Sequence, residues 1–262
     1  MGLLYQDFAL EDEKQLADFH IRIDRPRNLR RWWRPQAHFS FDGHLPFNPM
    51  PARLAAPFWE WGLNWCIANY AHQFLVIHAA VVERGGHALL ITAPPGSGKS
   101  TLCAALASRG WRLLSDELAL IRPEDGQIAP LPRPIGLKNE SIAVIRQFAP
   151  QAVLGPLWRD TRKGVVAHMR PAQDAVRRSE ETALPSWIIF LSYRAGSPAK
   201  LEPVKKSRAL IRLAESAFNY GILGELGFET TAHLTGSCSC YEFTYGNLDE
   251  AIEQLGGLSV AS

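Results

Sequence analysis

The sequence has few cysteines and no long apolar run. Four cysteines in 262 residues favour a reducing compartment over a disulfide framework. No apolar run reaches the roughly 18 residues that a membrane span needs. The opening residues, MGLLYQDFALEDEKQL, lack the basic start and apolar core of a signal peptide. From these absences we expect a cytoplasmic protein without a membrane partner.

Charge of one sign is also scarce. The net charge is +2, and no run of five like charges occurs, so we expect no electrostatic binding tail. One stretch, RPRNLRRWWRP at 25–35, places arginines beside two tryptophans, which could stack on a nucleobase or RNA. We favour a partly buried strand and turn whose arginine stems cover apolar surface. We therefore expect no nucleic-acid partner.

The chain does contain enough apolar residues for one sizeable domain with an appendage. Hydrophobic residues make up 47% of it, and we find no internal repeat. The apolar spacing of AAPFWEWGLNWCIANY, 55–70, predicts a helix. We expect its tryptophans to pack against the main sheet, with a base-stacking platform as the alternative. We assign 1–70 to an N-terminal extension packed on the core and 71–262 to the main domain.

The clearest local pattern is a predicted hairpin. FLVIHAAVVE, 74–83, and HALLITA, 87–93, are β-rich runs separated by Gly85 and Gly86. The second run leads directly into a loop rich in glycine, proline and serine, and then into a segment rich in alanine and leucine. That order predicts a strand, a loop and a helix, and so an α/β fold.

Further elements follow this loop and helix. WRLLS, 111–115, predicts a strand that delivers Asp116 and Glu117 at its end. Beyond it we expect short strands and loops, with two helices near 206–226 and 247–255. The fold class is therefore α/β with a mixed (α+β) sheet.

The loop APPGSGKST, 93–101, is the strongest functional signal. Backbone N–H groups of such a loop form a nest for phosphate oxygens, and the helix N-terminus that follows favours negative charge. A lysine in this position reaches the β- and γ-phosphates, and the next hydroxyl binds Mg²⁺. We therefore predict ATP and Mg²⁺ as ligands. The predicted nucleotide-binding residues are Pro95, Gly96, Ser97, Gly98, Lys99, Ser100 and Thr101.

The acidic pair Asp116 and Glu117 fits the same chemistry. In phosphate-loop folds the end of this strand lies beside the triphosphate, where a carboxylate holds Mg²⁺ directly or through water. With two acids, one can bind metal while the other accepts a proton from an attacking hydroxyl. We predict Ser100 as one metal ligand, with one of the two acids as the other. A turn-capping aspartate beside an exposed glutamate is the structural alternative.

Together these residues resemble a known family. IHAAVVERGGHALLITAPPGSGKSTLCAALASRGWRLLSDELALI is similar to the catalytic core of HPr kinase/phosphorylase. That resemblance implies a fold related to phosphoenolpyruvate carboxykinase and transfer of the γ-phosphoryl group to a serine hydroxyl. It also implies Asp116 as general base, Glu117 as its acidic neighbour near the metal, His78 as an assistant to the pair, and Lys99 as a phosphate ligand.

The chain departs from that family in two motif positions. Thr101 stands where HPr kinases usually have Glu, and the acidic pair is Asp-Glu rather than Asp-Asp. The whole chain looks more like the shorter HPr kinase-related proteins of biosynthetic and exopolysaccharide gene clusters, some of which phosphorylate a peptide serine. Because related enzymes commonly form oligomers, a homo-oligomer is one expectation.

Cationic side chains are also needed, because charge develops on the transferred phosphoryl group. Two loop stretches supply them, LPRPIGLKNESI at 131–142 and RDTRKGVVAHMRP at 159–171. We select Lys138, Arg162 and Lys163, ahead of the other cationic and histidine residues in these stretches, Arg133, His168 and Arg170. Ordinary surface charge is the alternative for each.

Two weaker candidates remain. Cys238 and Cys240 form one CxC pair, which we interpret as buried cysteines rather than a metal site. Asn219 and Tyr220 lie in a predicted packing helix, 216–229, from which they could reach a substrate.

The leading hypothesis is therefore an ATP-dependent kinase acting on a hydroxyl, most simply a serine of a small protein or peptide. A kinase for a small molecule such as free serine or a sugar would use the same core with a closed pocket. A nucleotide-dependent regulatory module with little transfer activity is the third possibility.

Overall fold

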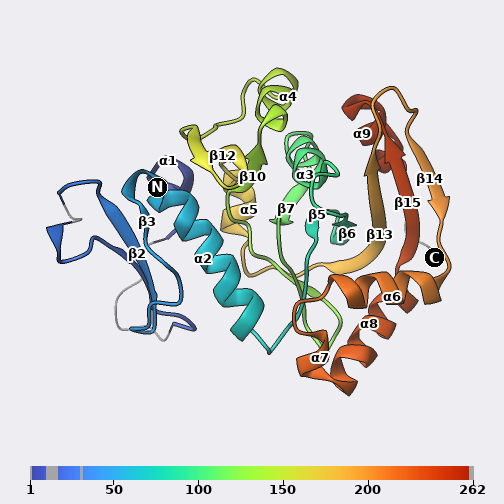
Figure 1. The fold of residues 1–262 in the computed structure, drawn as a ribbon. Coiled ribbons are helices and arrows are strands. Elements are labelled where there is room, and N and C mark those ends of the chain that lie inside the picture. The colour runs from blue at the N-terminus through green and yellow to red at the C-terminus, as the bar shows by residue number, and fades with distance from the viewer. Residues whose placement is uncertain (1, 10–16, 30–31, 260–262) are drawn as a thin grey trace.

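The computed structural model describes residues 2–9, 17–29 and 32–259. Within these ranges the chain is a mixed α/β fold, which confirms the expected class (Figure 1). The helices are α1 (Gly2–Tyr5), the short 3₁₀ helix η2 (Ala52–Leu54), α2 (Ala55–Tyr70), α3 (Lys99–Ala107), α4 (Glu140–Phe148), α5 (Gln173–Arg177), α6 (Lys206–Ser216), α7 (Tyr220–Leu223), α8 (Glu225–Ser237) and α9 (Leu248–Gly256). None of these described helices is long and apolar enough to cross a bilayer.

Most of the strands belong to one large sheet and three small ones. The strands are β1 (Ile21–Asp24), β2 (Gln36–Phe41), β3 (Met50–Pro51), β4 (Leu75–Ile77), β5 (Ala80–Arg84), β6 (His87–Thr92), β7 (Arg112–Ser115), β8 (Ala119–Ile121), β9 (Ile128–Ala129), β10 (Ile135–Lys138), β11 (Trp158–Thr161), β12 (Gly164–Met169), β13 (Leu184–Tyr193), β14 (Lys200–Pro203) and β15 (Ser239–Tyr245). The large sheet has the order β14-β15-β13-β6-β5-β7, and the small sheets have the orders β1-β2-β3, β4-β8-β9 and β10-β12-β11.

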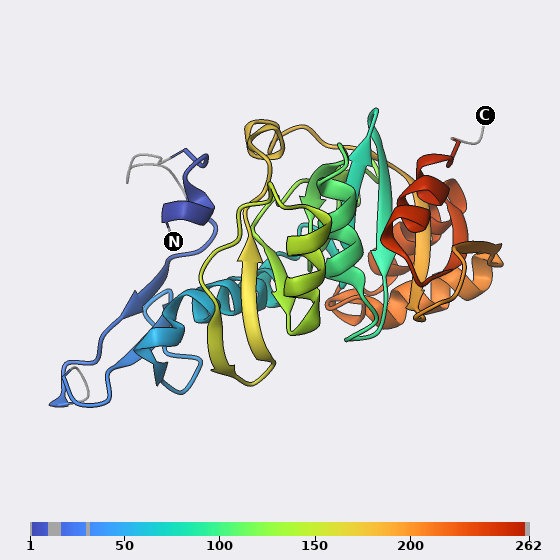
Figure 2. The ribbon, with the colours of Figure 1, turned by 90° about the horizontal axis from the view of Figure 1, so that it is seen from above.

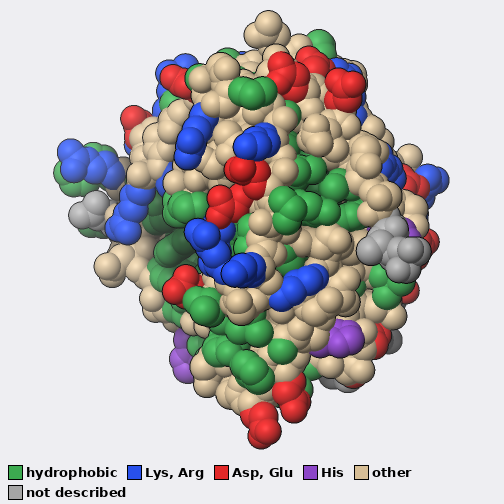
Figure 3. All heavy atoms as spheres, turned by 90° about the vertical axis from the view of Figure 1, so that its right-hand side faces the viewer, with side chains coloured by type: hydrophobic (Ala, Val, Ile, Leu, Met, Phe, Trp, Pro, Cys, Tyr) green, Lys and Arg blue, Asp and Glu red, His purple; other side chains and the backbone are tan. Residues whose placement is uncertain are grey.

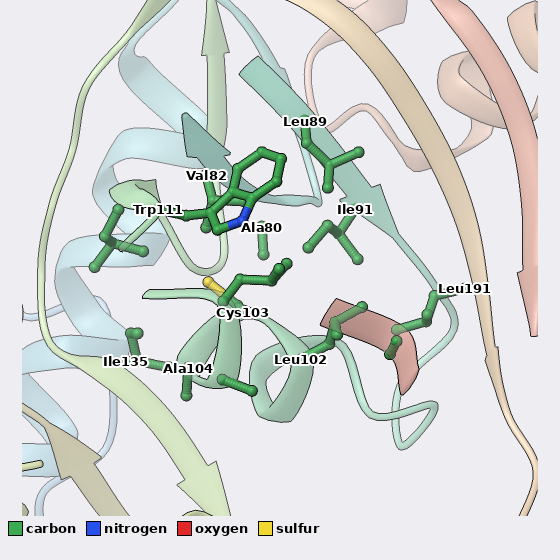
Figure 4. Packing of buried hydrophobic residues seen from close by; sticks show 14 of the residues in the cluster. Ala80, Val82, Leu89, Ile91, Leu102, Cys103, Ala104, Trp111, Ile135 and Leu191 are labelled. Carbon is green, nitrogen blue, oxygen red and sulfur yellow. The ribbon is translucent and has the colours of Figure 1, made fainter. Parts of the chain in front are cut away.

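The large sheet is buried on both faces. Successive side chains of a strand point to opposite faces. A strand of a sheet that is covered on both faces therefore needs apolar residues at successive positions, and β6 is an example. Leu89 and Ile91 pack toward α3, while Ala88 and Leu90 pack toward α6, α8 and the small sheet β4-β8-β9. Figure 4 shows Leu89 and Ile91 facing side chains of α3 such as Leu102. This double burial explains why 87–92 is an apolar run rather than an alternating one.

The predicted hairpin strand at 74–83 is wrong as a single element. β4 pairs with β8 in a small sheet, and β5 pairs with β6 and β7 in the large sheet. His78 and Ala79 form the break between them, because the N–H of His78 donates to the carbonyl oxygen of Ser216 at 2.9 Å instead of continuing a ladder. The break places His78 at the end of a strand.

The helix predicted near 206–226 is also interrupted. Residues 206–237 form α6, α7 and α8, with breaks at Ala217–Asn219 and at Gly224, whose φ is +58°. The amphipathic spacing continues through these breaks, so periodicity alone did not show them. The helix predicted at 247–255 is confirmed as α9. Helix α4 was not predicted.

Helix α2 confirms the predicted bounds but not the predicted packing. Its aromatic side chains contact the small sheet β1-β2-β3 rather than the large sheet, in a cluster with Phe39 and Phe47. Gly62 makes this possible, since a Cβ there would lie 2.0 Å from the ring of Phe39. The division at residue 70 stays a prediction, because Ile67 and Ala68 also pack against β4 and its neighbour Leu120.

The small sheet β1-β2-β3 lies at one end of the molecule and β14, β15 and α9 at the other (Figures 1 and 2). On the face around β14 and α6, basic and acidic side chains are interspersed (Figure 3). Ion pairs such as Lys200–Glu202 at 2.8 Å and Arg212–Glu242 at 3.1 Å account for this pattern. That face is therefore not a single-sign electrostatic surface.

Candidate functional site

Four strands of the large sheet end at the same edge. β13 runs parallel to β6 and β15, and β5 runs antiparallel to both β6 and β7. The carboxyl ends of β6, β7, β13 and β15 therefore coincide, and ligands of open α/β sheets bind at such an edge. The phosphate-loop candidate leaves β6 here, and the acidic pair leaves β7.

The loop has the backbone geometry of a phosphate nest. Gly96 and Gly98 both have φ of +85°, a left-handed conformation that favours glycine. Gly98 is also enclosed, because a Cβ there would lie 2.9 Å from the hydroxyl oxygen of Tyr245. Helix α3 begins at the next residue, Lys99, so its first backbone N–H groups point toward this loop.

Lys99 is buried, with 8% of its surface exposed. Burial lowers the pKa of Lys99, and the charges of Glu117 and Asp116 oppose that shift. None of the described residues gives its Nζ a hydrogen-bond partner. A buried ammonium is costly unless it is paired, so this lysine fits an anionic ligand held by the loop.

Asp116 is the most enclosed carboxylate at this edge, with 6% of its surface exposed. Its Oδ2 accepts a hydrogen bond from the N–H of Gly136 at 2.9 Å, while its Oδ1 finds no partner among the described residues. Burial and the negative charge of Glu117 raise the pKa of Asp116 to about 6, against the opposing effects of Lys99 and the Ser100 hydroxyl. A carboxylate with this pKa and one open oxygen is suited to accept a proton near neutral pH.

Glu117 differs from its neighbour because both of its oxygens have side-chain partners. Its Oε2 lies 3.2 Å from Nε2 of His78, and its Oε1 lies 3.7 Å from Nζ of Lys138. Burial would raise the pKa of Glu117, but the hydrogen bond with His78 and the charges of Lys99 and Lys138 outweigh it and lower the pKa. Glu117 is thus held ionised and fixes the positions of His78 and Lys138.

Two other predicted cations lie nearby. Arg162 and Lys163 occupy the turn between β11 and β12, and both line the same cavity as the acidic pair. Burial and the charge of Lys138 lower the pKa of Lys163, against the charge of Glu117. The structure therefore places the three cations selected from the sequence in the lining of one cavity with Glu117.

The cavity at this edge has a volume of about 790 Å³. Its lining includes His78, Asp116, Glu117 and Lys138 together with residues between 46 and 69 from the loop before α2 and from α2 itself. Residues 93–101, all of them described, do not line it. The phosphate loop thus lies outside this cavity, while Asp116 lines it and is close enough to Lys99 for their charges to interact.

Two residues that the sequence analysis ranked lower also line this cavity, namely Arg133 and His168. His168 is 6% exposed and sits opposite Gly136 in the β10–β12 ladder, next to Asp116. Burial and the charges of Arg133 and Lys138 lower the pKa of His168 to about 4. Sequence spacing gave no signal for this placement, because it depends on strand pairing.

Within the part of the chain that the structure describes, five buried side-chain atoms lack a hydrogen-bond partner. Four of them surround this edge of the sheet, and the fifth is Nδ1 of His72. The four are Nζ of Lys99, Oδ1 of Asp116, Nε of Arg133 and Nδ1 of His168. Because buried polar atoms are normally bonded, this concentration of unpartnered atoms makes the edge the candidate binding site.

Three weaker sequence candidates have structural explanations. Asn219 is buried, accepts from the N–H of Val76 at 2.9 Å and donates to the carbonyl oxygen of Phe74 at 2.8 Å, so it holds β4 rather than a substrate. Tyr220 packs against the core. Cys238 and Cys240 are buried, and burial raises the pKa of both thiols. No group of three or more potential metal-ligating His, Cys, Asp or Glu side chains occurs among the described residues.

The Arg/Trp-rich stretch at 25–35 was also misjudged in part. Residues 30 and 31 lie outside the described residues, and the described remainder is a loop between β1 and β2 rather than a strand. Trp32 and Trp33 are exposed, and the guanidinium carbon of Arg34 lies 5.8 Å from the ring centroid of Trp33. The described residues of this stretch do not line the cavity beside Asp116.

Comparison with known proteins adds a limited result. Residues 65–136 match the family model described as SynChlorMet cassette protein ScmC. That segment contains His78, the phosphate loop and the acidic pair, but it is little more than a quarter of the chain, so it shows similarity rather than membership. No curated protein matches the chain.

A solved structure, the Hpr(Ser) kinase/phosphatase from Coxiella burnetii, matches over 69% of this chain and 95% of that chain. The sequence identity is 13% and the TM-score is 0.28. A superposition of this quality carries no argument about the activity of this chain. The function proposed below therefore rests on the residues and geometry of the site.

Proposed function

We propose that this protein is an ATP-dependent kinase that transfers the γ-phosphoryl group to a hydroxyl, with a serine of a small protein or peptide as acceptor. The observation that carries the proposal is the placement of a buried carboxylate with one open oxygen, Asp116, beside the N-terminus of the helix that follows a glycine loop. The sequence resemblance to HPr kinase/phosphorylase points to the same chemistry.

The loop and α3 form the donor side. Backbone N–H groups between Gly96 and Ser100 bind phosphate oxygens, and Lys99 neutralises their charge. Mg²⁺-ATP supplies the phosphoryl group, and the Ser100 hydroxyl is the protein ligand that this motif offers to the metal. The unpartnered Nζ of Lys99 and the left-handed glycines fit this ligand.

Asp116 acts on the acceptor. Its Oδ1 accepts the hydroxyl proton as the oxygen–phosphorus bond forms and the bond between the γ-phosphorus and the bridging oxygen breaks, which releases ADP. The N–H of Gly136 holds Oδ2, so Oδ1 keeps one orientation. Most of the rate enhancement comes from such positioning and from fixed charges.

Glu117, His78 and Lys138 support this step from the side. In the structure Glu117 orients His78 and Lys138 through its two oxygens, so we assign it a positioning role in this state. Lys138 lies where it can approach a phosphoryl oxygen together with Arg162 and Lys163. The direct role of Glu117 as a metal ligand stays a sequence prediction.

A small-molecule acceptor is the second candidate, and the cavity volume favours it. About 790 Å³ lies within the range of roughly 300–1,000 Å³ that is common for small-molecule sites. Free serine or a sugar would use the same base and the same donor loop. An acceptor screen therefore has to include both classes.

The test is transfer of label from γ-labelled ATP in the presence of Mg²⁺. Serine-containing peptides, small proteins, free serine and sugars are offered to the parent chain, to Asp116→Asn and to Lys99→Met. Glu124→Gln, at an exposed carboxylate, is the matched control. We expect label in one hydroxyl class with the parent and with Glu124→Gln, and none with the other two. Nucleotide binding without transfer to any acceptor would favour the regulatory-module alternative.

A further inference from the structure

The cavity beside Asp116 has two chemically different walls. One wall carries the acidic pair and the cations, and it comes from the ends of β7, β10 and the β11–β12 turn. The other wall comes from the segment 46–69, which comprises the loop before α2, η2 and most of α2. This second wall lies far from the first in sequence and contributes no residue to the proposed phosphoryl-transfer chemistry.

The second wall is built from aromatic rings that fix one another. The ring centroids of Phe47 and Trp61 lie 4.5 Å apart, and those of Phe47 and Trp65 lie 4.9 Å apart. Phe58 is buried beneath them and stacks with Trp61 at 6.0 Å. Trp61 nevertheless keeps 43% of its surface exposed while it lines the cavity. A rigid, partly exposed aromatic surface inside a cavity is a binding surface for an apolar group.

The phosphate loop, 93–101, does not share the cavity with this aromatic wall, so the wall is available to the acceptor substrate. Residues 93–101 do not line the cavity, and Gly98 packs against Tyr193 and Tyr245 at the ends of β13 and β15. The proposed reaction requires the terminal phosphoryl group of a nucleotide on that loop to reach Asp116. The aromatic wall then lies on the acceptor side of Asp116.

Polar groups between the two walls match a peptide backbone. Arg133 is held by Glu60 at 3.3 Å and by the side-chain oxygen of Asn64, so its charge is already balanced. Its Nε and the Nδ1 of His168 find no partner among the described residues. Because Glu60 offsets the charge of Arg133, its free Nε suits a neutral carbonyl oxygen, while Lys138, Arg162 and Lys163 stay on the other wall of the cavity.

We infer that the segment 46–69 is an acceptor-recognition element, and that its ligand is a peptide in which an aliphatic or aromatic side chain flanks the hydroxyl-bearing residue. The flanking side chain packs on Trp61 and Phe47, and the backbone carbonyl oxygens meet Arg133 and His168. The inference rests on the proposed kinase function for the role of Asp116. It goes beyond that function in naming the recognition element and the side-chain class next to the acceptor hydroxyl.

The test measures binding rather than transfer. Capped pentapeptides of the form acetyl-Gly-Gly-Ser-X-Gly-amide and acetyl-Gly-X-Ser-Gly-Gly-amide, with X as Gly, Leu, Phe or Glu, are titrated calorimetrically into the full chain with ADP and Mg²⁺ present. An apolar side chain in a fitting pocket is worth about tenfold or more in discrimination. We therefore expect Leu and Phe peptides of one of these forms to bind at least about tenfold more tightly than Gly or Glu peptides.

The variant Trp61→Ala should remove that preference while the affinity for ADP stays unchanged. Trp33→Ala is the matched control, because Trp33 is 76% exposed and does not line the cavity, and it should behave like the parent. Circular dichroism and the thermal midpoint check that both variants fold. The comparison among peptides with the parent chain needs no variant, so it stands even if Trp61→Ala is unstable.

Several results would overturn the inference. Equal binding of Gly, Leu and Phe peptides by the parent would do so, and so would a loss of ADP rather than peptide affinity in Trp61→Ala, which would place the nucleotide base on this wall. The proposed function fails differently. If apolar peptides bind selectively but no label is transferred to them, the recognition element stands and the kinase reaction does not. If label is transferred equally to Gly and Leu peptides, the kinase reaction stands and the recognition element does not.

Discussion

Two clusters of buried charged side chains can be compared in this molecule. In the first, Glu83 and Arg112 are both almost fully enclosed and bonded to each other. Glu83 also accepts from the N–H of Gly86 at 2.6 Å, and Arg112 donates to the carbonyl oxygens of Arg178 and Glu181 at 2.9 Å each. Burial would raise the pKa of Glu83, but these partners lower it. The ion pair is thus saturated with hydrogen bonds.

The second cluster surrounds Asp116 and is not saturated. Asp116, Lys99 and His168 are as deeply buried as the first cluster, yet each keeps one polar atom without a partner among the described residues. The pKa of Asp116 is raised and that of Lys99 is lowered, in both cases chiefly by burial. Burial therefore disfavours the charged form of both groups.

The difference separates structure from function in chemical terms. A buried ion pair with every atom bonded contributes to holding one arrangement of the chain, and breaking it leaves a buried charge. A buried cluster whose polar atoms lack hydrogen-bond partners costs stability, and such clusters are typical of sites where a ligand supplies those hydrogen bonds. Mutations in the first cluster should therefore lower the free energy of unfolding. Mutations in the second cluster should lower activity.

Asp116→Asn is expected to give the largest effect on activity. Loss of a general base lowers transfer by about 10²–10⁴-fold. The thermal midpoint at pH 7 should not fall, because a group whose pKa is raised in the folded state loses its stabilising contribution as the pH rises through that pKa. Transfer assays and thermal unfolding check both parts. If Asp116→Asn lowers the thermal midpoint but keeps the parent's transfer rate per folded molecule, the assignment of Asp116 as the base is wrong.

Arg112→Met should give the largest effect on stability. It leaves Glu83 buried with the N–H of Gly86 and the more distant Arg178, at 3.7 Å, as partners, and breaking a buried pair costs roughly 3–5 kcal/mol. The variant should nevertheless bind ADP with the parent's affinity at a temperature where it is folded. Chemical denaturation measures the first quantity and calorimetry the second. A loss below about 1 kcal/mol, as for an exposed pair, would show that this cluster does not stabilise the fold.

Gly62→Ala tests the close contact between α2, which bears part of the aromatic wall, and Phe39 of β2. The added Cβ overlaps the buried ring of Phe39, and overpacking of this kind costs about 1–3 kcal/mol. Gly236→Ala in α8 is the matched control, since a Cβ there meets nothing within 4 Å. The control should be neutral or stabilised by up to about 1 kcal/mol, as expected for alanine in a helix. Equal effects in both variants would remove the argument for close packing at α2.

The pH dependence is the smallest and most specific effect. Because Asp116 must be ionised to accept a proton and its pKa is raised to about 6, transfer should rise with pH through that value and level off above it. Glu117→Gln removes a negative charge that raises this pKa, so the rising limb should move to lower pH. Glu124→Gln should leave the rising limb of the rate profile at the same pH as in the parent. A rate profile between pH 5 and pH 8 measures the shift, and an unchanged midpoint in Glu117→Gln would count against the coupling.

Much of the donor side could be predicted from the sequence. The strand at 87–92, the helix beginning at Lys99 and the acidic pair after β7 lie where the local pattern placed them. Those patterns are strong because hydrophobic periodicity and glycine conformation act over a few residues. The bounds of α2 were predicted for the same reason.

The acceptor side could not be predicted. The break at His78 depends on a hydrogen bond to Ser216, far along the chain, and the positions of Arg133 and His168 depend on which strands pair. The aromatic residues of α2 were expected on the large sheet but pack on the small one, and the same residues line the cavity. Periodicity identifies an apolar face but not its partner.

The sequence by itself determined the loop that leaves β6, the helix that follows it and the carboxylates that leave β7, because each depends on neighbours within a few residues. The tertiary structure decided which of those groups stay unbonded, and it brought 46–69 opposite Asp116. The physical reason is that burial and hydrogen-bond satisfaction depend on contacts between distant segments. Asp116 and Glu117 are adjacent acids in the sequence, and the fold left one with an unpartnered oxygen and paired the other with His78 and Lys138.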